Sequence, residues 1–333
     1  MFQRILVPLD GSRRAESAIP VAARLAHASG GSVILLQVVA PPVSTGKFGG
    51  PEVYPKGDID EELASATEYL KTLAQTSLLS GITTEVQTLV GAVAPEIIAA
   101  TQGLHADLIV MCSHGLTGFK RWMLGSVAHK FVPYSPVPVL ILRDGGPVLA
   151  DADTHPFQAL VPLDGSLLSE SALEPAVYIV AALASKARRA LQLLRVVDIT
   201  TSHSKFGMTD SYFDIQMRTE GKFQDEQYLK AVAQRLTGGE LAPYHLEVTT
   251  TVEIDPDVAQ AIVQAAEKTD GTGVASQVIV MATHGRGGLE RWVLGSVAER
   301  VLYSTKLPLL VVHASRIAHE TQAEALAWKE GIP

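Results

Sequence analysis

The fold is decided by a stretch that reads Met111-Cys-Ser-His-Gly115, then nine residues, then Gly125-Ser-Val-Ala128, then Val137-Pro-Val-Leu-Ile-Leu142. The apolar run Leu108-Ile-Val110 comes directly before it and is typical of a strand buried on both faces. Glycine and serine then precede an apolar-periodic segment, which is the pattern of a helix N-terminus. The stretch therefore predicts a strand, a glycine-bordered loop, a helix and a final strand.

The same stretch recurs later in the chain. It reads Met281-Ala-Thr-His-Gly285, nine residues, Gly295-Ser-Val-Ala298 and then Leu307-Pro-Leu-Leu-Val-Val312. The beginnings of the two halves also match, since Ile5-Leu-Val-Pro-Leu-Asp-Gly-Ser12 returns as Ala159-Leu-Val-Pro-Leu-Asp-Gly-Ser166. A repeat of this length predicts two duplicated domains and not a solenoid of short units.

The glycine-bordered loop favours an anionic ligand. Gly115 and Gly125 lack a Cβ, so the backbone can approach a ligand closely and adopt unusual dihedral angles. Ser126 is expected to cap the following helix, whose first amides carry the positive end of the helix dipole. A chain of phosphates between the strand end and the helix start would meet several N–H donors.

These residues resemble the nucleotide-binding signature of the universal stress protein family, Gly-x2-Gly-x9-Gly-Ser/Thr. Gly115, Gly125 and Ser126 match the signature in the first half. Its first glycine is replaced by Cys112 in one copy and by Ala282 in the other, which narrows the approach to the ligand without closing it. The second copy matches at Gly285, Gly295 and Ser296. The chain is identified as a tandem, two-domain member of the family.

The resemblance implies two doubly wound α/β domains, each with a parallel five-stranded sheet in the order 3-2-1-4-5. It also implies binding of an adenine nucleotide, ATP, with magnesium carried in by the nucleotide as the only metal. Asp10 and Asp164 would contact the adenine or ribose side, and Val38 and Val196 would contact adenine from the second strand. The phosphates would be held by Gly115, Gly125, Ser126 and Val127, and by Gly285, Gly295, Ser296 and Val297. The implied site further includes Pro8, Cys112, Pro162 and Ala282.

Length and composition set the broad class. The chain has 333 residues, of which 47% are hydrophobic and 19% charged, which is typical of a folded protein of about two domains. No apolar run reaches the roughly 18 residues of a membrane helix. A strand is expected at Phe2–Val7, where a signal peptide would lie. The single cysteine excludes an intramolecular disulfide framework. We expect a cytoplasmic protein without a membrane partner.

The net charge of −8 is unevenly distributed. Residues 1–150 carry 11 basic and 12 acidic side chains, whereas residues 151–333 carry 16 and 23. Neither half offers the basic patch that nucleic-acid binding requires, so we expect no nucleic-acid partner. The cations inside the two loops would attract an anionic ligand or simply be solvated: Lys120, Arg121, Arg286 and Arg291.

The expected domains cover residues 1–144 and 156–314, and residues 315–333 are expected to form a C-terminal tail helix. In the first half, one helix is expected to begin after Ser12 and to end at Gly30. A second helix is expected at about 58–79, and a third is expected to have Pro95 in its first turn. Strands are expected at 33–39, 84–90 and 137–142. The second half is expected to have strands at 157–163, 190–197 and 244–252 and helices at 166–186, 214–236 and 256–269.

Other functions remain open. Ser126, His114 and Asp10 could form a hydrolase triad, but Leu124-Gly-Ser-Val-Ala128 lacks the final glycine of a nucleophile elbow. Efficient catalysis is therefore not expected, although slow ATP turnover is compatible with the motif; His114 and His284 are expected to bond locally. Cys112 is expected to pack beside the loop, with redox sensing as the alternative.

A third alternative is a module without nucleotide that works through oligomerisation. The last strand of each half is an apolar sheet edge, which invites pairing with another edge. The resemblance implies a dimer contact there, made by a second chain in a homodimer or by the other half of the same chain. The favoured function is a nucleotide-binding regulatory protein of the stress response.

Overall fold

A computed structural model of the protein describes residues 2–41, 56–113, 125–143, 149, 157–184, 189–198, 212–239, 241–268, 275–283 and 294–313. The chain divides into two compact units, residues 1–146 and 147–333. Each unit is an α/β domain, and each is described by itself.

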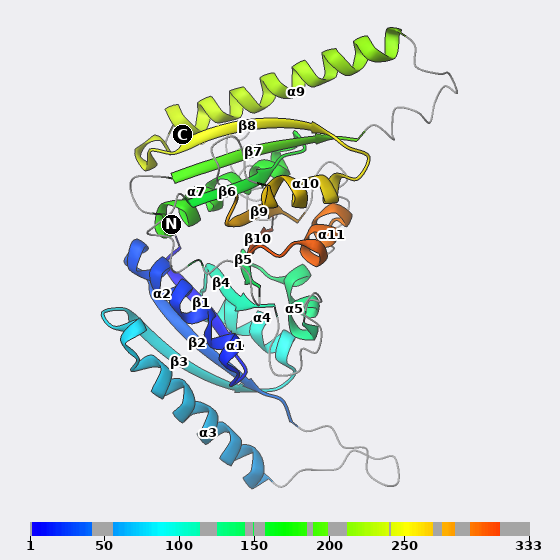
Figure 1. The fold of residues 1–333 in the computed structure, drawn as a ribbon. Coiled ribbons are helices and arrows are strands. Elements are labelled where there is room, and N and C mark those ends of the chain that lie inside the picture. Colours follow the sequence, from blue (N-terminus) through cyan, green and yellow to red (C-terminus); the bar gives the residue numbers. More distant parts are fainter. Residues whose placement is uncertain are drawn as a thin grey trace, which may run out of the picture. The chain divides into compact units, whose positions relative to one another are not determined.

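Unit 1 alternates strands with helices along the chain. Its elements are β1 (Arg4–Leu9), α1 (Arg13–Glu16), α2 (Ala18–Ser29), β2 (Ser32–Val39), α3 (Lys56–Ala74), η1 (Ser77–Leu79), β3 (Thr83–Val90), α4 (Val93–Gly103), β4 (Leu108–Cys112), α5 (Ser126–Phe131), η2 (Val132–Tyr134) and β5 (Val139–Leu142). The strands lie in the order β3-β2-β1-β4-β5 and all neighbours are parallel (Figure 1). The order implied by the resemblance is confirmed within this unit.

Unit 2 repeats the same plan. Its elements are β6 (Phe157–Pro162), α6 (Leu167–Glu170), α7 (Leu173–Leu183), β7 (Arg189–Val197), α9 (Tyr212–Gly238), η4 (Ala242–Tyr244), β8 (Glu247–Ile254), α10 (Val258–Glu267), β9 (Val278–Ala282), α11 (Ser296–Ser304) and β10 (Leu309–Val312). Its strands are parallel in the order β8-β7-β6-β9-β10, which is the same 3-2-1-4-5 arrangement.

The central strands are apolar on both faces because helices cover both sides of each sheet. Right-handed crossovers place α2 and α3 on one face of the unit 1 sheet and α4 and α5 on the other. The residues Ile5–Val7, Val33–Leu36, Leu108–Val110 and Val139–Ile141 are accordingly buried. Burial of this kind is the main favourable term in the stability of the unit.

Several helices differ from the expected bounds. The helix after Ser12 is broken at Ser17 into α1 and α2, and its counterpart is broken in the same place into α6 and α7. In unit 1, α3 ends at Ala74 and a 3-10 turn follows. The break matters for the site, because it separates the four-residue helix α1 from the longer helix α2 that follows it.

Other boundaries shift by a few residues. The strand expected from 244 begins at Glu247, because Ala242–Tyr244 forms a 3-10 turn and His245 has a left-handed backbone with φ 51°. The stop at Gly30 is confirmed, with φ 66° at the C-cap of α2. Pro95 lies in the first turn of α4, as expected.

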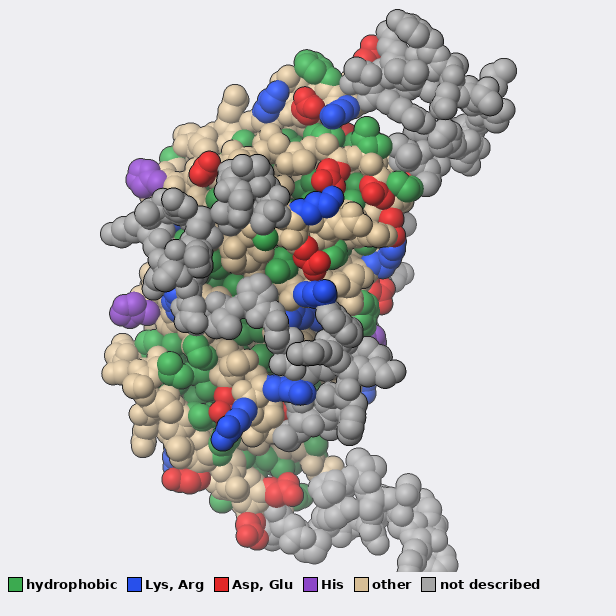
Figure 2. Space-filling model, in the orientation of Figure 1, with side chains coloured by type: hydrophobic (Ala, Val, Ile, Leu, Met, Phe, Trp, Pro, Cys, Tyr) green, Lys and Arg blue, Asp and Glu red, His purple; other side chains and the backbone are tan. Residues whose placement is uncertain are grey.

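Two expectations about the whole chain are not tested by the described residues. The tail 315–333 lies outside them, and pairing through the last strands remains a prediction. Among the described residues, no helix is long and apolar enough to span a bilayer. On the face drawn in Figure 2, acidic and basic side chains are interspersed, and neither sign forms a continuous field among the described residues.

Candidate functional site

In unit 1 the sheet register brings the carboxyl ends of three strands to one level. The last paired residues of β1 and β2 are Leu9 and Gln37, so Asp10 and Val38 come next on the two strands. The register of β1 with β4, continued in the same way, brings Asp10 level with Ser113. The connections that follow β1 and β4 run to opposite faces of the sheet, and ligands of open α/β sheets bind at such a switch point.

Unit 2 has the same alignment. The pairing of Pro162 with Leu194 brings Asp164 level with Val196. The register of β6 with β9 brings Asp164 level with Thr283, the counterpart of Ser113. In both units, therefore, an aspartate, a valine and the end of the fourth strand meet at the switch point.

In each unit, the glycine that directly precedes the serine of the signature is hydrogen-bonded to the end of the fourth strand. The amide of Gly125 donates to the Ser113 carbonyl oxygen at 2.7 Å, and the amide of Gly295 donates to the Thr283 carbonyl oxygen at 2.8 Å. Both acceptor residues are buried. These bonds fix the start of α5 and of α11 directly beside the switch point.

The predicted capping role of Ser126 is wrong, and its counterpart Ser296 is not a cap either. Gly125 and Gly295 are the N-cap residues, each with φ −60°, and neither helix start has a side-chain cap bond. Ser126 and Ser296 are the first helical residues and are exposed. A φ of −60° is open to any residue, so these glycines are not needed for backbone conformation. The missing Cβ matters only for close approach to a ligand.

The serines and the valines that follow them present an open helix start. Val127 and Val297 are half-buried, in the same pattern in the two units. The first amides of an α-helix have no acceptor within the helix and carry the positive end of its dipole. An anion placed before α5 or α11 would therefore meet uncommitted donors.

Each aspartate is held by a turn of the same geometry. Asp10 Oδ1 accepts from the Ser12 amide at 3.0 Å and from Ser12 Oγ at 2.6 Å. Gly11 between them has φ 83°, which favours glycine. Ser12 Oγ also caps α1 by accepting from the Ala15 amide at 3.1 Å. The same turn therefore both orients the Asp10 carboxylate and caps the start of α1.

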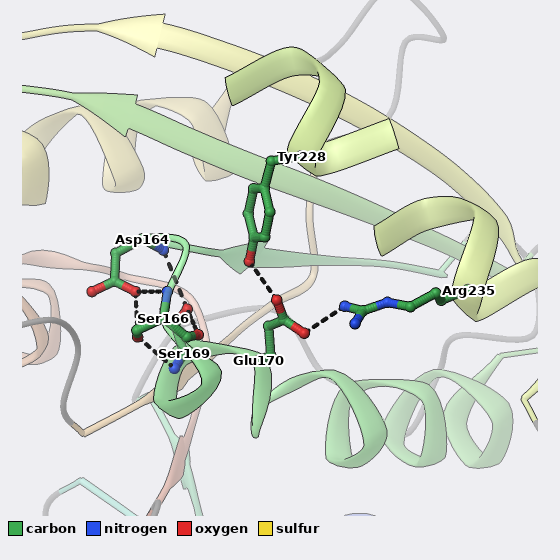
Figure 3. Close-up of polar contacts among 6 residues, drawn as sticks. All are labelled: Asp164, Ser166, Ser169, Glu170, Tyr228 and Arg235. Atoms are coloured by element: carbon green, nitrogen blue, oxygen red, sulfur yellow. Dashed lines mark hydrogen bonds and ion pairs between the residues drawn. The ribbon is translucent and has the colours of Figure 1, made fainter. Parts of the chain in front are cut away.

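The unit 2 turn reproduces this geometry. Asp164 Oδ1 accepts from Ser166 at 2.9 Å and 2.6 Å, and Gly165 has φ 81°. Ser166 Oγ accepts from the Ser169 amide at 3.1 Å. Ser169 adds a contact absent from unit 1, because its hydroxyl lies 3.3 Å from the Asp164 amide (Figure 3).

A tyrosine–glutamate bond braces the short helix in both units. Tyr69 donates to Glu16 and Tyr228 donates to Glu170, each at 2.9 Å. Burial is the main reason that the pKa of each tyrosine is raised above its ordinary value of 10, and the glutamate adds to the effect. The tyrosines therefore stay protonated donors at neutral pH.

Unit 2 has two further ion pairs in this region, one of which involves the glutamate of the brace. Arg195 Nε lies 3.1 Å from Asp225 Oδ1, and Arg195 Nη1 donates to the Leu163 carbonyl oxygen at 3.3 Å. The Arg195 side chain is only 8% exposed. Arg235 pairs with the second carboxylate oxygen of Glu170, opposite the Tyr228 bond (Figure 3).

Unit 1 has neutral residues at the same positions. Gln37 stands where unit 2 has Arg195, Ala66 where it has Asp225, and Thr76 where it has Arg235. Gln37 Oε1 is buried without a hydrogen-bond partner in the described part of the chain. The two units therefore share a scaffold and differ in the charges around it.

The position of the missing first glycine also differs between the units. Cys112 Sγ lies 3.0 Å from Ser17 Oγ, so the end of β4 contacts the residue that ends α1. Ala282 is 7% exposed at the same position of β9. The contact supports a packing role for Cys112 and shows that the end of α1 lies beside the start of the signature.

Pro8 and Pro162 lie half-buried near the ends of their strands, two residues before the aspartates. Gly115, Gly285, His114, His284 and the four loop cations lie outside the described residues. Among the residues that are described, no group of three or more side chains could hold a metal ion.

Sequence reasoning missed the braces. Their signal was present, because Tyr69-Leu-Lys71 recurs as Tyr228-Leu-Lys230 in the helix before the third strand. Arg195 was also detectable as a lone cation inside an apolar strand. The glutamates gave no comparable signal, since a glutamate in a first helical turn is common.

Comparison with known proteins gives a consistent result. The sequence model of the universal stress protein family matches residues 1–143 and again residues 158–313. A universal stress protein of Mycolicibacterium smegmatis is 26% identical over 92% of this chain and 96% of that protein. One from Mycobacterium tuberculosis is 28% identical over 93% of this chain and 96% of that protein. The crystal structure of a universal stress protein from Archaeoglobus fulgidus matches the fold with a TM-score of 0.60 and 24% identity, over 93% of this chain and 95% of that one.

Proposed function

Because the chain belongs to the universal stress protein family, with one family domain in each half, we propose that each unit binds an adenine nucleotide at its switch point. ATP is the expected nucleotide, and it brings magnesium with it. The protein then acts as a nucleotide-responsive regulator of the stress response in the cytoplasm, with little or no catalysis.

One observation carries the proposal. In each unit an oriented carboxylate, a half-buried valine and a glycine amide bonded to the end of the fourth strand meet at the switch point. Asp10 suits a ribose hydroxyl or an adenine donor, because a carboxylate accepts hydrogen bonds. Val38 supplies an apolar surface beside it. The open start of α5 suits phosphate oxygens.

The expected affinity follows from the size of the ligand. ATP has roughly thirty heavy atoms, and about 0.3 kcal/mol per atom gives about 9 kcal/mol, near micromolar dissociation. One helix dipole contributes only about 0.3–1 kcal/mol of this. Replacement of the first signature glycine by Cys112 or Ala282 therefore weakens binding by about tenfold and does not abolish it.

Calorimetric titration with ATP, AMP and cyclic AMP tests the proposal. The matched variants are Gly125→Ala and Gly295→Ala, whose φ of −60° accepts alanine without strain. Each should weaken binding in its own unit by about tenfold or more, because a Cβ would stand where a phosphate approaches, while the other unit is unchanged.

The same experiment separates the alternatives. Absence of heat with all three nucleotides would overturn the proposal and favour a module that works through oligomerisation. Rapid phosphate release that is lost on changing Ser126 or His114 would favour a hydrolase. Binding without turnover supports the regulatory function.

A further inference from the structure

One peptide group of unit 2, which joins Leu163 to Asp164, is held at both ends by side chains. Its carbonyl oxygen accepts a hydrogen bond of 3.3 Å from Arg195 Nη1. Its N–H donates a hydrogen bond of 3.3 Å to Ser169 Oγ (Figure 3). A peptide group is planar, so bonds at both ends fix its orientation. The backbone that leads into the aspartate is therefore set by one side chain from β7 and one from α6.

These two clamp residues, Arg195 and Ser169, are themselves held in place, and both are buried. Arg195 Nε lies 3.1 Å from Asp225 Oδ1 on α9, and this bond sets the direction of the planar guanidinium. The Ser169 hydroxyl donates its proton to the Ser166 carbonyl oxygen at 2.8 Å, so its oxygen is left to accept from the Asp164 amide. Side chains locked in this way are what precise placement of a binding group requires.

The clamp residues act on the carboxylate through the turn that follows. Asp164 Oδ1 accepts from the Ser166 amide at 2.9 Å and from the Ser166 hydroxyl at 2.6 Å. Figure 3 shows the second carboxylate oxygen of Asp164 pointing away from Ser166. Because one oxygen is committed to the turn, the direction of the other depends on the backbone that carries the side chain. Fixing the peptide group before Asp164 therefore fixes the direction of that oxygen at the switch point.

Unit 1 forms the same aspartate turn without the clamp residues. Ala15 stands where unit 2 has Ser169, and alanine has no hydroxyl. Gln37 stands where unit 2 has Arg195, and its Oε1 is buried without a hydrogen-bond partner in the described part of the chain. The turn and the fold thus form without the two clamp side chains. Their identity is therefore open to a role at the site.

We propose that Arg195 and Ser169 are positioning residues of the unit 2 site, which hold the Asp164 carboxylate in the orientation that accepts a hydrogen bond from the nucleotide. This inference rests on the proposed nucleotide binding. A group that is ordered before binding spares the complex the cost of ordering it. Loss of either clamp bond should therefore weaken ATP binding in unit 2 by about three- to tenfold, which is the usual cost of ordering one side chain.

Hydrogen exchange on the whole chain measures ATP binding in each unit. Protection of the peptides that cover residues 157–184 is followed during titration with ATP, and the peptides that cover residues 4–29 report on unit 1. The clamp variants are Ser169→Ala and the pair Arg195→Gln with Asp225→Ala, because these give unit 2 the residues of unit 1. The pair is changed together so that no single charge is left buried. Each variant should raise the ATP concentration that half-saturates unit 2 by about three- to tenfold and leave unit 1 unchanged.

A double-mutant cycle shows whether the clamp residues act through the aspartate. Asp164→Asn keeps one acceptor oxygen for the turn and replaces the other oxygen by an amide donor, so it removes the group that is positioned. In this background the clamp variants should weaken ATP binding by less than about twofold. A purely structural role of Arg195 and Ser169 would instead give the same loss in both backgrounds.

Ile262→Val is the matched control for stability. Ile262 is buried in α10, a helix that carries neither clamp residue. Loss of one methylene from the core destabilises unit 2 without changing the aspartate turn. The affinity of unit 2 for ATP should therefore be the same as in the wild type. Exchange of the β7 amides without ligand shows that each variant is folded.

The outcomes distinguish the two levels of the proposal. Absence of protection by ATP in unit 2 of the wild type would overturn nucleotide binding in that unit. Protection in the wild type, with clamp variants that bind ATP equally well or lose the same factor in the Asp164→Asn background, would overturn only the positioning role. A loss of ATP affinity in Ile262→Val as large as in the clamp variants would also overturn it, because reduced stability would then explain the effect.

Discussion

The two units form the same turn and brace from the same residues, but they surround them with different charges. Asp10 and Asp164 each accept a hydrogen bond of 2.6 Å from a serine hydroxyl, and the glutamate of each short helix accepts a hydrogen bond of 2.9 Å from a tyrosine. Around this shared frame, unit 2 has a buried ion pair and a second partner for its glutamate. Unit 1 has glutamine, alanine and threonine at those positions.

This difference distinguishes the residues that the fold requires from the residues that can vary without changing the fold. The residues that set backbone geometry at the switch point, Asp-Gly-Ser and the glycine at the helix start, are the same in both units. The residues that surround them vary in charge, and both versions are built on one topology. The charges are therefore expected to tune stability and ligand binding locally in each unit.

The largest expected effect concerns the buried ion pair of unit 2. Asp225→Ala leaves the Arg195 guanidinium buried without its carboxylate and should lower the unfolding free energy of unit 2 by about 3 kcal/mol. The value is at the low end of the usual range because the Asp225 side chain is 21% exposed. Native-state hydrogen exchange measures this loss of free energy, because the amides of β7 report on unit 2 and the amides of the unit 1 strands report on unit 1.

The control converts unit 2 to the composition of unit 1. Arg195→Gln combined with Asp225→Ala removes both charges and should cost only about 1 kcal/mol. The reverse change, Gln37→Arg alone, should destabilise unit 1, and adding Ala66→Asp should restore most of the loss. Equal costs for the single and double variants of unit 2 would show that the pair contributes nothing through its charge.

The braces should respond unequally to the same substitution. Tyr69→Phe removes the one side-chain bond described for Glu16 and should cost unit 1 about 1.5 kcal/mol. Tyr228→Phe should cost unit 2 about 0.5 kcal/mol, because Arg235 still holds Glu170. Hydrogen exchange of β2 and β7 measures both, and a larger loss in unit 2 would contradict the expectation.

The braces also predict a pH dependence. Each tyrosine has a folded pKa above its unfolded value of 10, so its contribution is complete below pH 10 and is lost as the pH rises through the folded pKa. Wild type and Tyr69→Phe should therefore converge in stability under alkaline conditions. Urea unfolding at neutral pH and above pH 10 measures this, and a constant difference would exclude the tyrosine as its source.

Sequence periodicity and the duplicated motifs were sufficient to predict the α/β class and the two units. The strand order, and with it the level at which Asp10, Val38 and the end of β4 meet, was implied by the resemblance to the family. The sequence patterns failed at Ser126, because Gly-Ser before a helix fits either residue as the cap and only backbone dihedrals decide. They also missed the Arg195–Asp225 pair. Its partners lie thirty residues apart on different elements, and no local pattern joins them.

A smaller effect, equal in the two units, is expected at the serine caps. Ser12→Ala and Ser166→Ala should each cost about 1 kcal/mol, because each serine makes the same bonds to its aspartate and to a helix amide. Hydrogen exchange of α2 and α7 measures them. Costs that differ by more than about 1 kcal/mol would show that the two turns are not energetically equivalent.

The smallest expected effect lies at the start of α10, where unit 2 again has a charge that unit 1 lacks. Asp257 caps this helix by accepting from the Gln260 amide at 3.1 Å and pairs with Arg300. Its counterpart Ala92 has no side-chain cap. The Arg300 bond is the main cause that lowers the Asp257 pKa below its ordinary 3.8.

That depressed pKa fixes the sign of the last prediction. Asp257 stabilises unit 2 fully above its unfolded pKa of 3.8, and the contribution is lost as the pH falls through the folded value. Asp257→Asn keeps a cap and removes the charge, so it should lower the Tm of unit 2 slightly at pH 7 and have no effect at strongly acidic pH. Asp257→Ala should remain destabilising at both, since the cap is lost as well. If the two variants were equal at pH 7, the cap would contribute nothing, and the advantage of Asp257 over Ala92 would come from the ion pair alone.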